Sequence, residues 1–175
     1  MPEYRLLEES DIRPDLLDDF IWRVEVTHDW QKGRAKKLRK PRLIERTLEE
    51  LRSEVKFSLL PMVYGRRVLG HRGAVFGAFE GQRLVGFAFL RDKLLEGCHS
   101  LAVLWVSQDC RGRGIGKALF MLCADAARAA GARTLYISAE PNADTQAFYR
   151  KLGCVDTERL KNAGPKTDVP LVYGL

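Results

Sequence analysis

The chain has 175 residues, of which 46% are hydrophobic and 30% are charged, and its formal net charge is +6. This length is enough for one hydrophobic core, so we expect a single domain over residues 1–175. No run of 18 apolar residues is present, and the opening stretch MPEYRLLEESDIRPD is acidic and polar, unlike a signal peptide with its basic and apolar regions. Composition therefore argues against a membrane or secreted protein and predicts a cytoplasmic one with no membrane partner.

Cysteine and histidine do not form a metal-binding pattern. The four cysteines are Cys98, Cys110, Cys123 and Cys154, and no two have the Cys-x-x-Cys spacing of a zinc or redox site. Cys98 and His99 are adjacent, but the other histidines are scattered along the chain. We therefore expect reduced thiols and no bound metal.

The first third of the chain predicts a strand and two helices. The stretch YRLLE indicates a short strand, and Asp11 followed by Pro14 is typical of a helix start. Apolar residues then recur at helical spacing over residues 16–24, and a second such pattern covers residues 43–55. Between the two expected helices lies a run of seven basic residues with no acidic one: Lys32, Arg34, Lys36, Lys37, Arg39, Lys40 and Arg42.

The rest of the chain predicts mainly strands. Residues 73–79 and 84–90 are short apolar runs that indicate a β-hairpin with its turn near Gly81. A strand at residues 100–106 precedes a helical stretch, and a strand at residues 135–139 precedes another. The last two runs, GCVDTERL and DVPLVYGL, predict a pair of antiparallel strands, in which Pro170 indicates an edge or irregular position.

Three glycines, Gly112, Gly114 and Gly116, stand at the start of the helical stretch after residues 100–106. Glycines at a helix start cost backbone entropy, but they let an anion reach the unpaired amides at the positive end of the helix dipole. A plain strand-to-helix turn is the alternative, although Arg111, Arg113 and Lys117 beside the glycines favour an anion such as phosphate. The spacing fits neither a Walker loop nor a dinucleotide fingerprint.

The pattern Arg111-x-x-Gly114-x-Gly116 resembles the pyrophosphate loop of the GNAT superfamily of N-acetyltransferases. A second segment, LYISAEPNADTQAFYRKLGC, is similar to the family's next strand, its Asn and a helix with Phe-Tyr-x-x-x-Gly-Phe/Cys. The two segments cover roughly residues 101–155, and the likeness outside them is vaguer. The resemblance implies an α/β (α+β) fold with a central mixed, mostly antiparallel sheet of about six to seven strands flanked by about four helices.

The resemblance also implies acetyl coenzyme A as the acetyl donor. The positions that correspond to the family's cofactor-binding residues are Leu104, Trp105, Val106, Arg111, Gly112, Arg113, Gly114, Ile115, Gly116, Lys117, Asn142 and Phe148. A backbone amide within residues 104–106 is expected to donate to the thioester oxygen.

Two catalytic side chains follow from the same resemblance and from what the reaction needs. Tyr149 is the expected proton donor to the departing thiolate, because a phenol stays protonated at physiological pH; a purely packed core tyrosine is the alternative. The general base is less clear, because the chain has Ala102-Val103 where many family members have Glu or Asp. Glu140 is the best substitute, followed by Glu80, Glu96 and His99, and a water chain or an amine captured in its neutral form remains an alternative.

The expected function is acetyl transfer to a primary amine of a small molecule. The alternatives are a protein or peptide N-acetyltransferase and a non-catalytic coenzyme A-binding sensor. In this fold the segment between the first two helices borders the acceptor site, so residues 32–42 are either a solvated loop or a surface that attracts an acidic acceptor or a coenzyme A phosphate. Nucleic acid is disfavoured as a partner because the run lacks interleaved aromatics. A homodimer is left open.

Overall fold

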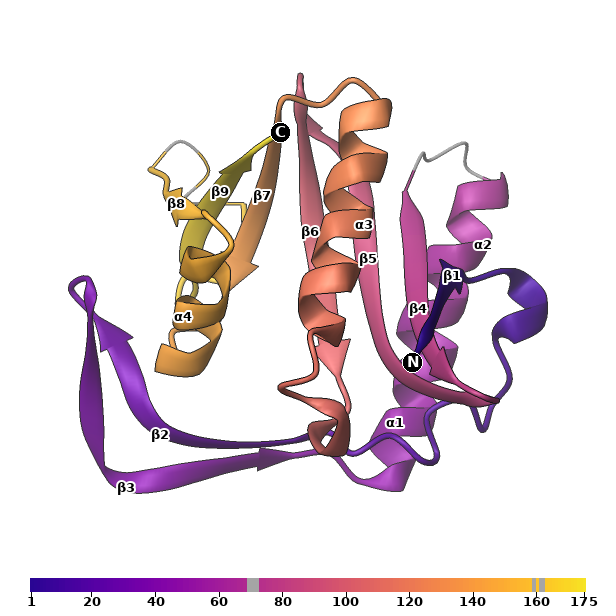
Figure 1. Cartoon of the computed structure of the whole chain (residues 1–175), viewed down its shortest axis with the longest axis horizontal. Coiled ribbons are helices and arrows are strands. Elements are labelled where there is room, and N and C mark those ends of the chain that lie inside the picture. Colours follow the sequence, from indigo (N-terminus) through magenta and orange to yellow (C-terminus); the bar gives the residue numbers. More distant parts are fainter. Residues whose placement is uncertain (69–72, 159, 161–162) are drawn as a thin grey trace.

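A computed structural model of the chain describes residues 1–68, 73–158, 160 and 163–175. Its centre is a seven-stranded sheet with the order β1-β4-β5-β6-β7-β9-β8, in which only β6 and β7 are parallel neighbours (Figure 1). These strands are β1 (Glu3–Leu6), β4 (Ala74–Glu80), β5 (Arg83–Leu95), β6 (Cys98–Val106), β7 (Thr134–Ala139), β8 (Val155–Asp156) and β9 (Val169–Gly174). The α-helices in the described part of the chain are α1 (Leu48–Glu54), α2 (Leu60–Val68), α3 (Ile115–Ala129) and α4 (Ala143–Lys151). The predicted mixed, mostly antiparallel sheet is confirmed.

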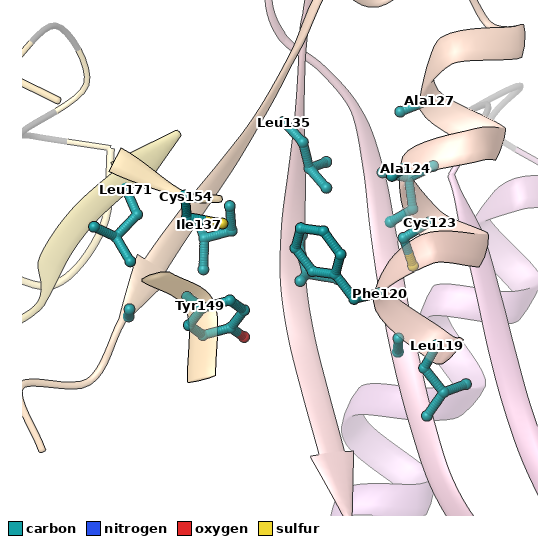
Figure 2. Close-up of a cluster of buried hydrophobic side chains, with 14 of the residues drawn as sticks. Leu119, Phe120, Cys123, Ala124, Ala127, Leu135, Ile137, Tyr149, Cys154 and Leu171 are labelled. Carbon is teal, nitrogen blue, oxygen red and sulfur yellow. The ribbon is translucent and has the colours of Figure 1, made fainter. Parts of the chain in front are cut away.

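Helix α3 covers one face of the sheet with an apolar stripe (Figure 2). Its buried residues recur at helical spacing: Ile115, Leu119, Phe120, Cys123, Ala124 and Ala127. They belong to the same core as Leu135 and Ile137 of β7 and Leu171 of β9, none of which is more than 1% exposed. Burial of one such aliphatic side chain contributes roughly 1.5–3 kcal/mol, so this layer fixes α3 against the sheet.

The opposite face of the sheet packs against α1, α2 and the π-helix η2 (Val55–Leu59) between them. Leu51, Val55 and Leu59 lie four residues apart and are nearly fully buried with Phe87 of β5. From Phe87 to Leu90, successive residues of β5 belong alternately to the cores on the two faces, as expected for a central strand.

The first of the two helices predicted in the first third of the chain is wrong, because residues 16–24 form no helix. Residues 16–19 form turns, and Arg23 begins a long hairpin of β2 (Arg23–Gln31) and β3 (Arg34–Glu45). A short 3-10 helix, η1 (Glu9–Asp11), stands before Pro14, where a helix start was predicted. The apolar residues at 16, 17 and 20 are buried by this turn, so helical spacing arose without a helix.

The second expected helix starts later than its apolar pattern. Residues 43–45 pair with residues 23–25 in the hairpin, and α1 begins only after Thr47. The Thr47 hydroxyl accepts from the Glu50 amide at 3.3 Å, and the Glu50 carboxylate accepts from the Thr47 amide at 2.7 Å. This capping box fixes the true start of the helix.

The predictions for the later strands are largely confirmed. Strands β4 and β5 form the expected hairpin around Gly81, whose φ is 61°. Strands β8 and β9 pair antiparallel, and β9 also pairs with β7, so β9 is not an edge strand and Pro170 has the other predicted placement, an irregular position. The pairing with β8 covers Leu171 and Val172 only, which places Pro170 just outside it. Arg159 of the predicted strand lies outside the described residues.

Candidate active site between strands β6 and β7

Strands β6 and β7 pair over only four residues and then diverge. Residues 98–101 pair with residues 134–137, whereas β6 continues to Val106 without β7 beside it. The register of β6 against β5 shifts at Ala102, which is the extra residue of a β-bulge. Figure 1 shows the two strands separating from this point, with α3 and α4 on either side. The bulge thus marks the place where the sheet opens.

The opening exposes backbone groups of β6. The Ser107 amide donates to the Val85 carbonyl of β5 at 2.9 Å. Since successive residues of a strand direct their backbone groups to opposite sides, the polar groups of Leu104 and Val106 face away from β5, toward the opening. The guanidinium of Arg111 donates to the Val106 carbonyl at 3.1 Å, which agrees with this direction.

Glycine lines the loop that joins β6 to α3. Gly112 and Gly114 have φ of 75° and 82°, and a Cβ atom added to either would meet nothing within 4 Å. Gly114 is the residue that caps α3, and the Ala118 amide makes the first bond of the helix, to the Gly114 carbonyl at 3.0 Å. The amides of residues 115–117 therefore have no partner within the helix, next to the glycines beside which the loop leaves open space.

Gly116 is required for a different reason, which is close packing against its neighbours. A Cβ atom there would lie 3.3 Å from the Phe148 ring and 3.6 Å from the Val106 side chain. Gly116 and Phe148 therefore bring the start of α3 close to α4. Of the three predicted glycines, Gly112 and Gly114 open the loop, and Gly116 permits close packing.

A hydrogen-bonded cluster holds this loop to the sheet. Arg83 of β5 donates to both carboxylate oxygens of Asp109, at 2.7 and 3.0 Å, and the Ser107 hydroxyl donates to the same carboxylate at 2.5 Å. These bonds, that of Arg83 first, lower the pKa of Asp109 to about 2. The Ile21 amide donates to the Ser107 hydroxyl oxygen at 2.9 Å. The cluster thus joins the loop to two distant segments, and no local pattern in the sequence predicts it.

The three predicted basic residues of the loop differ in their surroundings. Arg113 forms an ion pair with Glu80, which lowers the pKa of that carboxyl. Desolvation lowers the pKa of Arg111, which lies against the end of β6, and the charge of Asp144 opposes this effect. Lys117, in the first turn of α3, is in no ion pair among the described residues.

Predicted residues Glu140 and Asn142 meet where β7 leads into α4. Asn142 caps the helix by accepting from the Thr145 amide at 2.8 Å, and its side-chain amide donates to Glu140 at 3.1 Å. Desolvation and then the charge of Asp168 raise the pKa of Glu140, while Asn142 and the charge of Arg46 oppose the rise. Glu140 is therefore a better proton acceptor than an ordinary surface carboxylate.

Tyr149 is buried on the inner side of α4. Its ring lies 5.0 Å from that of Phe148 and 6.2 Å from that of Phe120, centroid to centroid. Figure 2 shows its hydroxyl oxygen directed from α4 toward the side where α3 lies. Burial raises the pKa of this phenol, so it stays protonated at neutral pH and can act as a donor.

Strand β2 crosses the open end between β6 and β7, which the sequence did not predict. At one end, the Trp22 ring packs on Trp105 of β6 with 3.7 Å between centroids. At the other, the Trp30 amide donates to the Pro141 carbonyl at 2.6 Å, beside the start of α4. Arg46, at the base of the hairpin, lies 4.3 Å above the Trp22 ring. Only contacts between residues far apart in sequence reveal this arrangement.

The other candidate bases lie elsewhere. Glu80 is engaged by Arg113, Glu96 precedes the start of β6, and His99 is buried near that same end. The opening lies at the far end of β6, away from Glu96 and His99, and Glu80 is held there by Arg113, so Glu140 is the candidate base at that end that has no cationic partner in an ion pair among the described residues.

Two surveys of the described residues bear on metals and membranes. Within the described ranges, no group of three or more His, Cys, Asp or Glu side chains is arranged to hold a metal ion. All four cysteines are free and buried in the structure. No helix in the described part of the chain is both long enough and apolar enough to cross a membrane.

Known proteins resemble the chain in this region and in the whole fold. The model of the acetyltransferase (GNAT) family matches residues 34–154. The PaiA N-acetyltransferase of Thermoplasma acidophilum, solved with coenzyme A, is 18% identical with a TM-score of 0.67, over 100% of this chain and 99% of that one. A protein of Bacillus anthracis str. Ames described as a streptothricin acetyltransferase, solved with acetyl coenzyme A, is 18% identical with a TM-score of 0.69, over 100% and 98%.

Nourseothricin acetyltransferase is 17% identical with a TM-score of 0.67, over 98% of this chain and 95% of that one. At these identities the likeness concerns the fold. No curated protein sequence matches the chain significantly.

Proposed function

Since the chain belongs to the acetyltransferase (GNAT) family and is an N-acetyltransferase, we propose that it transfers the acetyl group of acetyl coenzyme A to the primary amine of a small molecule. We also propose that residues 1–175 act as one domain. The observation that carries the proposal is the start of α3, where Gly112 and Gly114 leave open space beside helix amides that have no partner within the helix.

The loop and the start of α3 fit the pyrophosphate of the cofactor. A Cβ atom at Gly112 or Gly114 would occupy the space that an anion needs, and the helix dipole favours negative charge there. Lys117 adds a cation in the same turn. When bound, acetyl coenzyme A supplies an acetyl group activated as a thioester. The residues proposed to hold it are Leu104, Trp105, Val106, Arg111, Gly112, Arg113, Gly114, Ile115, Gly116, Lys117, Asn142 and Phe148.

Glu140 is proposed to take the proton of the acceptor amine. An amine with a pKa near 10.4 costs roughly 4.6 kcal/mol to present in its neutral form at pH 7, so a base with a raised pKa lowers the barrier. The raised pKa of Glu140 and its hydrogen bond from Asn142 support this role.

Two donors are proposed to act on the thioester. The Leu104 amide, which faces the opening, donates to the thioester oxygen as negative charge develops there. The Tyr149 hydroxyl then gives its proton to the departing thiolate. The buried position of the ring on α4 supports this step, and the raised pKa keeps the phenol protonated until the thiolate forms.

A small acceptor is proposed because β2 spans the open end of the site. Its contacts with Trp105 at one end and Pro141 at the other restrict the approach of a large substrate between β6 and β7. Two of the similar structures are named for acetylating nourseothricin or streptothricin, which favours a small acceptor over a protein.

The proposal is tested by incubating the protein with acetyl coenzyme A and a panel of acceptors. The panel pairs small amines (polyamines, amino sugars and amino acids) with peptides that carry a free N-terminus or lysine. Free thiol and the mass of the product are measured. We expect thiol release above the amine-free background with at least one small amine, whose product gains one acetyl group. Release with peptides alone would instead indicate a peptide N-acetyltransferase. If none of the acceptors raised thiol release above the amine-free background, the proposal would be contradicted.

A further inference from the structure

The positive charge of the chain is concentrated on the β2–β3 hairpin. Residues 32–42 hold seven of the 29 basic residues and none of the 23 acidic ones, so the rest of the chain has a formal charge of −1. All seven basic residues are exposed. The charge is therefore a property of one surface and not of the protein as a whole.

These cations are largely free of acidic partners. Arg42 pairs with Asp29 at 2.6 Å, and it is the only one of the seven with an ion pair among the residues that the structure describes. The opposite strand, β2, offers only Glu25 and Asp29 as acidic residues. The six remaining cations of the hairpin repel one another, and an anionic partner relieves that repulsion.

The hairpin presents its cations on a ribbon that is held at both ends. Its base packs through Trp22 on Trp105, and its outer part is held by the Trp30 amide and by Arg150, which lies 4.7 Å above the Trp30 ring. The register shifts between Val26 and His28, where residues 38–41 bulge and the hairpin bends (Figure 1). The turn at Lys32 and Gly33 has positive φ at both residues, as in a tight two-residue hairpin turn.

The shape and chemistry of this ribbon select the kind of partner. The cations are spread along β3 and the turn before it, over a longer surface than a small anion covers. Protein interfaces are depleted of lysine and centred on aromatic residues, whereas residues 32–42 contain no aromatic residue. A two-stranded ribbon does fit the major groove of B-form DNA, which is about 12 Å wide, and Lys and Arg side chains neutralise its phosphates.

We infer that the β2–β3 hairpin is a docking surface for double-stranded DNA, which it contacts through the phosphates without reading sequence. The sequence had argued against nucleic acid because the basic run lacks aromatics. That argument concerns stacking on single strands and base recognition, and contacts to phosphates do not need aromatic residues. This inference does not depend on the acceptor or on the catalytic residues.

The test measures binding of the full chain to a fluorescent DNA duplex of about 20 base pairs by anisotropy, at several salt concentrations. The hairpin variant carries Arg34→Gln, Lys36→Gln, Arg39→Gln and Lys40→Gln. The matched control carries Arg13→Gln, Lys56→Gln, Arg128→Gln and Lys166→Gln and loses the same net charge. A duplex RNA of the same length is a second ligand, because its narrow major groove does not admit such a ribbon. Affinity for acetyl coenzyme A is measured for each variant.

If about five cations meet phosphates, the logarithm of the association constant should fall with the logarithm of salt with a slope near −4.5. The hairpin variant should bind at least about 30-fold more weakly at about 50 mM salt, with a slope near −1, while the control stays within about threefold of the parent. Both variants should bind acetyl coenzyme A as the parent does, which also shows that they are folded.

Three outcomes would overturn the inference. Equal weakening in the control would indicate net charge alone. Equal or tighter binding of the RNA duplex would exclude binding of the hairpin in the major groove of DNA. Weaker binding of acetyl coenzyme A by the hairpin variant would assign these cations to the cofactor.

Discussion

Two glycines in different parts of the molecule have nearly the same backbone and opposite importance. Gly33, in the turn of the β2–β3 hairpin, has φ of 79°, and Gly114, at the start of α3, has φ of 82°. A Cβ atom would meet nothing within 4 Å at either position. Gly33 only reverses the chain, whereas the space beside Gly114 adjoins the unpaired amides of a helix.

The surroundings explain the difference. The loop that contains Gly114 is joined to β5 through the Asp109 and Arg83 cluster, so its open space has a defined position. The hairpin turn around Gly33 is exposed and displays side chains instead of backbone amides. A glycine with positive φ therefore indicates a binding site only where neighbouring backbone amides are free to donate hydrogen bonds.

The largest expected effect comes from placing the same substitution at both glycines. Gly114→Asp adds bulk and negative charge where we place the pyrophosphate, so binding of acetyl coenzyme A should weaken more than about 100-fold, or about 2.7 kcal/mol. Gly33→Asp imposes the same backbone strain and should leave the affinity unchanged. Calorimetry with folded variants measures both. Binding by Gly114→Asp within about threefold of the parent would make the two glycines equivalent.

Removing the Tyr149 hydroxyl should have the next largest effect. Tyr149→Phe keeps the ring against Phe148 and should lower the rate constant of the chemical step about 100-fold, with little change in cofactor affinity. Tyr173→Phe is the matched control, because Tyr173 packs 5.1 Å from the same Phe120 ring. Single-turnover kinetics at saturating acetyl coenzyme A separates chemistry from product release. If both substitutions changed the rate constant of the chemical step only slightly, Tyr149 would have a packing role and no catalytic one.

Glu140→Gln should lower kcat/KM about 30-fold at neutral pH. The carboxylate must be deprotonated to act as a base, and its pKa is raised above 4.5. Activity of the parent should therefore fall as the pH drops through that raised value, and the variant should lack this limb. The titration of the acceptor amine affects both proteins equally, so it cancels in the ratio of their kcat/KM values at each pH. Asp168→Asn removes a charge that raises the pKa of Glu140, so the acidic limb of the pH profile should shift to lower pH. An unchanged limb in Glu140→Gln would exclude Glu140 as the base.

The smallest expected effect concerns the cluster that holds the loop. The folded pKa of Asp109 is about 2, below its ordinary value of 3.8, so its contribution to stability is present above pH 3.8 and is lost as the pH falls through about 2. Because the pair is partly exposed, Asp109→Asn should cost about 1 kcal/mol at pH 7. The difference should shrink in denaturant unfolding near pH 2.5. A difference independent of pH would show that the ion pair does not stabilise the loop.

The same two regions show how far sequence reasoning reaches. The loop was predictable because its glycines, its preceding strand and its helix are contiguous, and the later strands alternate clearly. The hairpin was not, because its apolar residues pack on distant partners: Trp22 on Trp105, and Trp30 beside Pro141. Apolar residues at 16, 17, 20, 21 and 24 matched a helix by spacing alone, although the β-branched residues at 24, 26 and 27 suit a strand.

Within the site, individual residues were predicted better than their interactions. Sequence reasoning named Glu140 and Asn142 separately, but only the fold shows that Asn142 caps α4 and donates to Glu140. It treated three glycines as one motif, whereas Gly116 packs against Phe148. The Asp109 and Arg83 pair could not be predicted, because a salt bridge between a loop and a strand 26 residues away leaves no periodic pattern in the sequence.

The most direct test of the account is the melting temperature of the unaltered protein with saturating acetyl coenzyme A, ATP or NADH. A ligand that binds only the native state at about 100 times its Kd stabilises it by about 2.7 kcal/mol, which raises the melting temperature of a domain of this size by several degrees. We expect this rise with acetyl coenzyme A and none with ATP or NADH. Equal rises with all three ligands, or no rise with acetyl coenzyme A, would contradict the assignment of the loop between β6 and α3 as its binding site.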